Sequence, residues 1–189
     1  MLFRKRAISV RQESLQWFSG SPAMQLWQKL VRFPDHLLAQ VDPVEVNLAC
    51  AEGLPGAANI NRQHLCETFD GWAQRVRQET LRLRVYFERD PGKYENSAAY
   101  FRMLVLFTVL QRDLGVRYNP ALIDRDDFFA DAKNLFVHGV LHGDGGTCTS
   151  LPPVFAAVGR RLGYPLTLAT TKYHVFMRWD DPKGERFNM

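Results

Sequence analysis

The stretch Gly145-Gly-Thr-Cys-Thr-Ser-Leu-Pro-Pro-Val-Phe-Ala-Ala-Val-Gly-Arg-Arg-Leu-Gly163 decides how the C-terminal part of the chain folds. Two prolines near its start and a glycine at its end are typical of a helix, which we expect to begin at or just after Cys148. The free N–H groups at a helix start stabilise a negatively charged sulfur. Cys148 is therefore a candidate nucleophile, and a buried structural cysteine is the alternative.

Strand-like segments follow this helix. Residues 165–171 are apolar and β-branched, and residues 173–179 alternate so that His174 and Met177 lie on opposite faces. After a turn at 180–184, residues 185–189 predict a returning strand. A histidine on a strand near a nucleophilic cysteine is typical of a Cys-His pair, so His174 is the candidate base.

A histidine base needs a partner that orients its second ring nitrogen. Asp180 shares the strand parity of His174 but lies about 20 Å away along an extended strand, which is too far. Asn188 lies opposite or diagonal to His174 if the hairpin is centred near residue 181 or 182. We expect Asn188 to complete the site, and an ordinary strand-end asparagine is the alternative.

The segment before Cys148 is rich in glycine, which lets a backbone approach a substrate closely. N–H groups of this segment are candidates for an oxyanion hole, and a histidine there would line the approach to the cysteine. The expected oxyanion and substrate loop comprises Gly145, Gly146, Thr147 and His142. His138 and His142 are spaced like a metal pair, but the glycine between them weakens a helix, so we expect no metal and no cofactor.

The N-terminal three-fifths of the chain predicts helices. Asp42-Pro-Val-Glu45 is a capping signature for a short helix that Gly53 ends. Apolar spacing predicts a long amphipathic helix from residue 61 to about 87. A third, mostly apolar helix is expected from about 96 to 115, and a fourth over 126–136. The sequence thus predicts helices first and strands after them.

The run Gly146–Pro165, followed by Tyr173–Trp179 and Glu185–Asn188, resembles the transglutaminase-like superfamily, in particular its bacterial members. Residues 46–55 and 96–103 are similar to the helical region that precedes the core in one bacterial branch. The resemblance implies an α+β fold, in which a helical N-terminal region is followed by a papain/transglutaminase-like core with the Cys-bearing helix packed on an antiparallel sheet. It also implies an N-terminal extension over 1–40, and a domain over 41–189 whose core motif at 138–189 ends before the sheet is complete.

By position, the resemblance makes Cys148 the nucleophile, His174 the base and Asn188 the residue at the family's usual Asp position. An amide can orient the imidazole, but it stabilises an imidazolium less than a carboxylate does. The implied chemistry is acyl transfer or hydrolysis of a peptide or protein amide through a thioester, without a cofactor. The alternative is a non-catalytic member of the same fold that binds a peptide or a partner protein.

Composition and charge disfavour other classes. The chain has 189 residues, of which 46% are hydrophobic, so it can bury a core, and its apolar runs are shorter than a membrane helix. A net charge of +4, with glutamates among the arginines of the long helix, favours a solvated helix face over a nucleic-acid interface. The basic start lacks the apolar segment of an export signal. Three cysteines without a CxxC pair predict reduced thiols and a cytoplasmic location.

Overall fold

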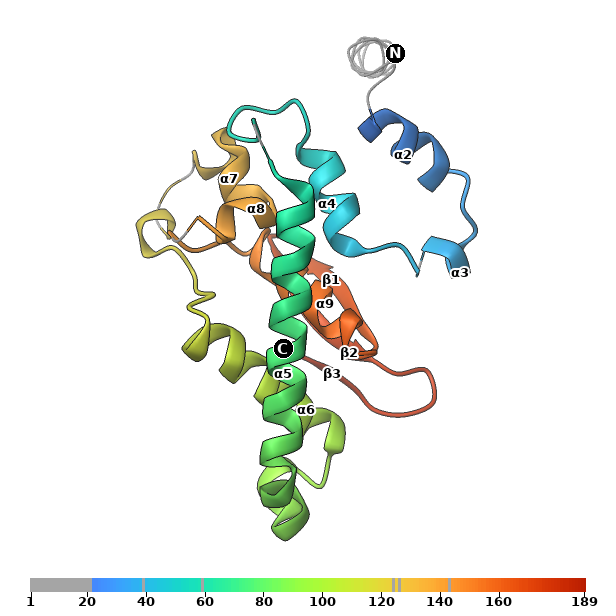
Figure 1. Ribbon diagram of the computed structural model, residues 1–189, viewed down its shortest axis with the longest axis vertical. Coiled ribbons are helices and arrows are strands. Elements are labelled where there is room, and N and C mark those ends of the chain that lie inside the picture. The colour runs from blue at the N-terminus through green and yellow to red at the C-terminus, as the bar shows by residue number, and fades with distance from the viewer. Residues whose placement is uncertain (1–21, 39, 59, 124, 126, 143) are drawn as a thin grey trace.

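The computed structural model describes residues 22–189 except 39, 59, 124, 126 and 143. The fold is α+β: helices make up most of it, and a small antiparallel sheet lies at the C-terminal end (Figure 1). The helical elements are α2 (Pro22–Leu30), α3 (Asp35–Leu38), α4 (Pro43–Ala51), α5 (Arg62–Arg89), η1 (Pro91–Tyr94), α6 (Ala98–Thr108), η2 (Val109–Asp113), η3 (Pro120–Leu122), η4 (Phe128–Ala130), α7 (Ala132–Leu135), α8 (Val137–Val140) and α9 (Leu151–Arg161). Of the predicted N-terminal extension, residues 1–21 and 39 lie outside the described residues, and α2 packs against α4.

Two predicted helices in the N-terminal half are confirmed with their caps. Asp42 accepts a hydrogen bond from Val44 N at 2.9 Å at the start of α4, which ends before Gly53 in the left-handed region (φ 82°). Asn61 caps α5 in the same way, by accepting from His64 N at 3.0 Å. The inner face of α5 is fully apolar, with Leu65, Phe69, Ala73 and Val76 buried.

The third predicted helix is also confirmed, and it ends in an unusual turn. Ser97 caps α6 by accepting from Tyr100 N at 2.8 Å. The helix then widens into the π-helical turn η2 and ends before Gly115. Buried residues such as Met103 and Leu106 place α6 in the core, against α5 and α9.

The prediction of a continuous fourth helix over 126–136 is wrong. Asp131 is extended (φ −116°, ψ 124°) and accepts from Lys133 N at 2.9 Å, so it starts a new helix, α7, instead of continuing one. Phe136 is extended as well and separates α7 from α8. The two short helices pack so closely that a Cβ on Gly139 would lie 1.7 Å from Lys133 O.

The strands β1 (Leu166–Thr171), β2 (His174–Asp180) and β3 (Arg186–Asn188) form an antiparallel sheet in this order. Helix α9 packs on β1 and β2 and contacts α4, α5 and α6. Met177 and Trp179 of β2 are buried, whereas His174 is exposed, which confirms the predicted alternation. Gly159 lets α9 approach β1, because a Cβ there would lie 2.1 Å from Leu166 Cδ1.

Arg161, at the end of α9, joins this helix to the N-terminal helices. Its side chain is only 15% exposed and contacts both oxygens of Asp42, at 2.5 and 3.1 Å. Its Nε lies 2.6 Å from Asp70 Oδ1 on α5. Its guanidinium carbon lies 5.7 Å from the centre of the Phe69 ring. One side chain therefore fixes α9 relative to α4 and α5.

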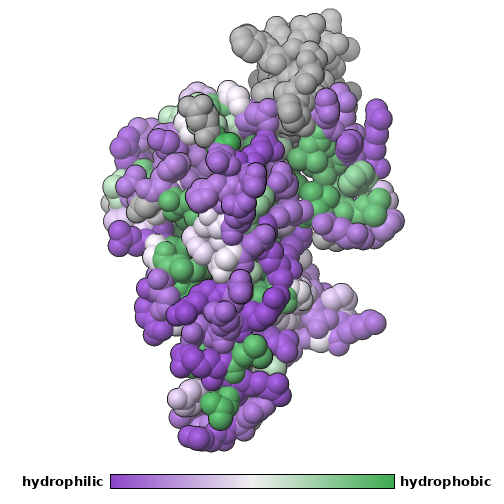
Figure 2. Space-filling view, in the orientation of Figure 1, coloured by the Kyte–Doolittle hydropathy of each residue, from purple (hydrophilic) through white to green (hydrophobic). Residues whose placement is uncertain are grey.

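The outer face of α5 is charged and faces solvent. This helix crosses the front of the molecule in Figure 1, and hydrophilic side chains cover much of the same region in Figure 2. Arg82 pairs with Glu79 at 2.7 Å and Arg84 with Glu88 at 2.6 Å. The glutamates among the arginines thus form ion pairs along the helix, as expected for a solvated face. In the part of the chain that the structure describes, no helix has the length and apolar character needed to cross a membrane.

Candidate active site

Cys148 lies in a turn before α9, and the helix itself begins three residues later, at Leu151. Leu151 N donates to Thr147 O at 3.0 Å, and Thr147 N donates to Ser150 Oγ at 2.9 Å, so hydrogen bonds hold both ends of the turn. The predicted helix is confirmed, but it starts at the late end of the expected range. The cysteine side chain is half-buried.

The glycines before Cys148 serve close backbone packing. Gly146 pairs with the segment 117–119 in a parallel bridge: its N–H donates to Arg117 O at 2.8 Å, and its carbonyl accepts from Asn119 N at 2.8 Å. Gly145 has φ 97°, and a Cβ there would lie 2.7 Å from Arg117 O. These positions therefore require glycine for the fold itself.

This bonding corrects the predicted oxyanion loop. The N–H groups of Gly146 and Thr147 are already donated to Arg117 O and Ser150 Oγ, so neither is available to an oxyanion. Thr147 is buried, and its hydroxyl donates to Asn134 O at 2.6 Å. The side chain of Thr147 thus anchors the cysteine turn to α7, which is a structural role that local sequence does not reveal.

Cys148 and His174 line the same pocket, of about 180 Å³, although they come from different elements. Cys148 reaches it from the turn before α9, and His174 from the first position of β2. Apolar side chains make up most of the remaining wall. They are Phe107, Leu151, Pro152, Phe155, Val175, Phe176, Met177 and Met189. The pocket thus combines the two predicted reactive groups with an apolar lining.

Asn188 does not pair with His174. In the observed register Asn188 lies opposite Arg178 and accepts a hydrogen bond from Arg178 Nε at 2.7 Å. The predicted hairpin centre is wrong. Strand pairing continues up to Asp180, and the N–H of Asp181 donates a hydrogen bond to Glu185 O at 3.2 Å. The turn is therefore centred nearer to residue 183. Four strand residues, about 13 Å, separate Arg178 from His174. Among the described residues, no hydrogen bond reaches the His174 ring.

Two polar residues of the pocket were not predicted. Gln111 comes from the π-helical turn η2, a type of turn that is frequent at functional sites. Tyr118 comes from the segment that pairs with Gly146. Burial raises the pKa of Tyr118, and so does the electrostatic effect of the neighbouring Cys148 side chain. A hydrogen bond with the backbone of Cys148 acts in the opposite direction and lowers this pKa. Only the long-range bridge brings Tyr118 to the cysteine, so local patterns could not indicate it.

His142 lies elsewhere than predicted. It lines a second cavity, together with His138, and not the Cys148 pocket. Cys50 and Cys66 lie outside both pockets, and burial raises the pKa of each thiol. For Cys66, the nearby carboxylate of Glu45 raises the pKa further, to about 11. Within the described ranges, no three His, Cys, Asp or Glu side chains are placed to hold a metal ion.

The arrangement can support thiol chemistry: one half-buried cysteine and one exposed imidazole share an apolar pocket with an amide and a phenol. Asn188 and the N–H groups of Gly146 and Thr147 have other partners. Comparisons of the chain with protein-family models, with curated proteins and with solved structures found no significant match.

Proposed function

We propose that this protein is a cysteine enzyme of the transglutaminase-like type, which transfers or hydrolyses the acyl group of a peptide or protein amide through a thioester. The observation that carries this proposal is the shared pocket of Cys148 and His174. Since Asn188 pairs with Arg178, the reactive unit is a Cys-His pair and not a Cys-His-Asn triad. The three cysteines of the protein are free thiols, which fit a reducing compartment. We therefore also propose a cytoplasmic location.

The reaction begins when the imidazole of His174 takes the proton of the Cys148 thiol, which gives a thiolate and an imidazolium. The sulfur attacks the amide carbonyl carbon, and the carbon–nitrogen bond breaks as the amine leaves with a proton from the imidazolium. Water then attacks the thioester, gives a proton to the imidazole and releases a carboxylic acid. If an amine attacks instead of water, the product is a new amide. In either case the free thiol is restored.

Binding of the acyl group follows from the pocket wall. Phe107 and Phe155 stack with ring centres 4.4 Å apart, and Phe176 lies on the same wall, so an apolar acyl side chain is favoured over a charged one. Because two loop N–H groups are donated elsewhere, we assign the donor role toward the carbonyl oxygen to the side-chain amide of Gln111.

Alkylation of the three cysteines tests the Cys-His pair. The protein is treated with iodoacetamide at pH 6.5, and peptide mass spectrometry follows each cysteine separately. We expect Cys148 to react faster than a free thiol and His174→Gln to abolish the difference. Cys50 and Cys66 serve as internal references, because their raised pKa values keep both protonated. Equal rates for Cys148 in the wild type and in His174→Gln contradict the proposal.

A substrate assay tests the chemistry itself. Fluorogenic peptide amides with a leucine or phenylalanine acyl residue are compared with an otherwise identical aspartate peptide. We expect turnover of the apolar substrates only, and none with Cys148→Ala. Adding a primary amine distinguishes the two reactions, since transfer gives an amide product and hydrolysis an acid. A preference for the aspartate peptide contradicts the assignment of the acyl pocket.

One observation favours a second candidate function, peptide or partner binding without catalysis. His174 has no orienting hydrogen bond among the described residues, so its ring is not held as a base usually is. In this case an apolar peptide occupies the pocket and stays intact. Binding that persists unchanged in Cys148→Ala, together with no reaction of the wild type, supports this second function.

A further inference from the structure

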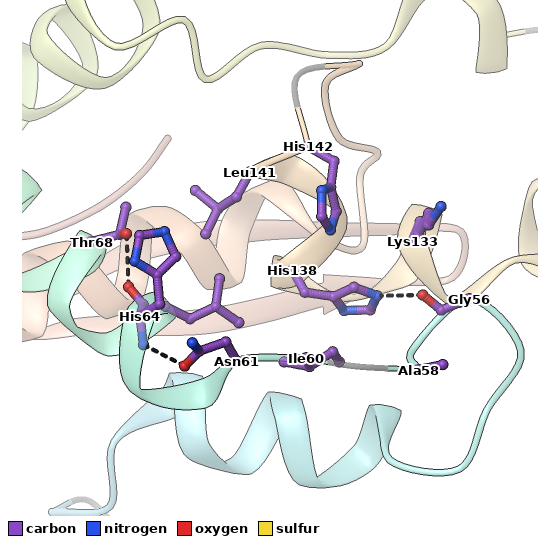
Figure 3. A pocket seen from close by; sticks show the side chains of 11 residues that line it. Gly56, Ala58, Ile60, Asn61, His64, Thr68, Lys133, His138, Leu141 and His142 are labelled. Atoms are coloured by element: carbon purple, nitrogen blue, oxygen red, sulfur yellow. Dashed lines mark hydrogen bonds between the residues drawn. The ribbon is translucent and has the colours of Figure 1, made fainter.

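The second cavity, of about 520 Å³, shares no lining residue with the Cys148 pocket. Figure 3 shows its walls: the first turns of α5 on one side, α7 and α8 with the residues after them on the other, and the segment before α5 along its base. The volume falls within the range of small-molecule sites. Nothing in the proposed chemistry of Cys148 uses this cavity.

The cavity wall is basic. Its eleven described lining residues include Lys133 and three histidines, His64, His138 and His142, and none is acidic. Nearby carboxylates have other partners: Asp131 caps α7 by accepting from Lys133 N, and Glu52 pairs with Arg62 at 2.6 Å. The carboxylate of Asp131 lies close to Gly56 and acts on His138, but no carboxylate lines the cavity, so an anion there meets the ammonium group of Lys133.

The start of α5 adds to this charge. α5 has 28 residues and no acidic residue in its first turn, so the positive end of its dipole is not neutralised by its own side chains. The cap Asn61 and His64 of the first turn line the cavity. The helix start thus coincides with the basic wall, an arrangement that favours a bound carboxylate or phosphate group.

His138 supplies an unused polar group. Its side chain is 3% exposed, and its Nε2 lies 3.2 Å from Gly56 O, which can only accept, so this nitrogen carries the proton (Figure 3). Burial lowers the pKa of His138 and keeps the ring neutral, which leaves a lone pair on Nδ1. Nδ1 is buried without a hydrogen-bond partner among the described residues. A donor on a ligand would satisfy it.

Apolar side chains complete the cavity: Ile60, Leu65 and Leu141 line it beside the polar groups. A single permanent cation, Lys133, suits a singly charged group better than a phosphate dianion. We propose that this cavity binds a small organic carboxylate with an apolar body and an N–H or O–H donor, the chemistry of an N-acylated apolar amino acid. The carboxylate lies between Lys133, His64 and the start of α5, and the donor faces His138.

The test uses N-acetyl-L-leucine as the probe, followed by calorimetry and by the NMR signals of the histidine rings. All measurements are made on the full chain with Cys148→Ala, so that neither thiol chemistry nor the proposed function affects the result. We expect saturable binding that shifts the signals of His64, His138 and His142. The uncharged N-acetyl-L-leucinamide should bind at least about tenfold more weakly, since it loses the charge-assisted hydrogen bonds.

A pair of variants locates the site. Lys133→Gln with His64→Gln removes two exposed cavity side chains and should weaken binding at least about tenfold. Lys93→Gln with His36→Gln makes the same chemical changes on exposed residues outside the cavity and should leave binding unchanged. The proposal is overturned by equal affinity for acid and amide, by equal effects of the two variants, or by no saturable binding of the probe. The comparison of acid with amide needs neither of these two double variants, so it decides the question even if one of them misfolds.

Discussion

Arg161→Met tests whether the end of α9 is held mainly through one carboxylate. Methionine keeps a long apolar chain but removes the guanidinium that contacts Asp42, Asp70 and the Phe69 ring. The two carboxylates differ in burial: the side chain of Asp42 is 31% exposed, whereas that of Asp70 is 67% exposed. The free energy of unfolding should therefore depend on Asp42 much more than on Asp70.

The magnitude follows from these exposures. The two-point contact with Asp42 is a charge-assisted pair in a partly buried setting, which contributes about 1.5 to 3 kcal/mol. The exposed pair with Asp70 contributes about 0 to 1 kcal/mol, and the cation–π contact with Phe69 about 0.5 to 1 kcal/mol. Arg161→Met should therefore lower the free energy of unfolding by about 2 to 4 kcal/mol, because these terms do not add fully.

Urea unfolding of single and double variants separates the contributions. Asp42→Asn is suited to this cycle, since asparagine still caps α4 and only the charge is lost. We expect a coupling energy of about 1.5 to 3 kcal/mol between Arg161→Met and Asp42→Asn, and below about 1 kcal/mol with Asp70→Asn. Similar coupling energies for the two carboxylates would refute the reasoning from burial.

Three further outcomes are expected. Gly139→Ala should destabilise the protein by about 3 kcal/mol or more, because its Cβ meets backbone, whereas Gly71→Ala, with open space around the new methyl group, should stabilise α5 by about 0.5 to 1 kcal/mol in urea unfolding. At pH 9, Cys66 should react with iodoacetamide about fiftyfold more slowly than a thiol of ordinary pKa, and Glu45→Gln should raise its rate; an unchanged rate contradicts the role of the carboxylate. Because burial lowers the pKa of His138, the stability that its neutral ring contributes is complete above pH 6.5 and is lost as the pH falls through the lowered pKa. His138→Phe should show a smaller loss between pH 6.5 and 5 in urea unfolding, and parallel curves for variant and wild type would exclude this effect.

Local signals predicted the elements whose ends are fixed by nearby side chains. Asp42, Asn61 and Ser97 cap the helices that the sequence indicates, because a cap and its bonded N–H lie within three residues. The strand alternation around His174 also depends only on neighbours. The order of helices followed by strands was accessible in this way. That Cys148 and His174 line one pocket was expected from the chemistry of a Cys-His pair and not from a local signal.

The remaining features depend on contacts between distant segments. The N–H of Gly146 is donated to Arg117 O, so its expected role at the oxyanion could not be judged without knowing which segment lies beside it. The position of Asn188 depends on the hairpin register, and a shift of the turn centre by one residue moves its partner by two. The break at Asp131 shows the opposite case, a local cap that outweighs a helical apolar pattern.

The bridge between Tyr118 and Gly146 makes the nucleophile turn dependent on a segment that is synthesised much earlier. Bringing these two ends together closes a loop of about thirty residues, which costs about 3 kcal/mol of chain entropy before any contact forms. The turn around Cys148 should therefore assemble late in folding, after the segment 117–119 between η2 and η3 is in place. A fragment that spans only 138–189 contains both reactive residues but lacks residues 117–119 and α7, which hold the turn. Mixing it with a fragment that ends at residue 137 should restore thiol reactivity that neither fragment has alone.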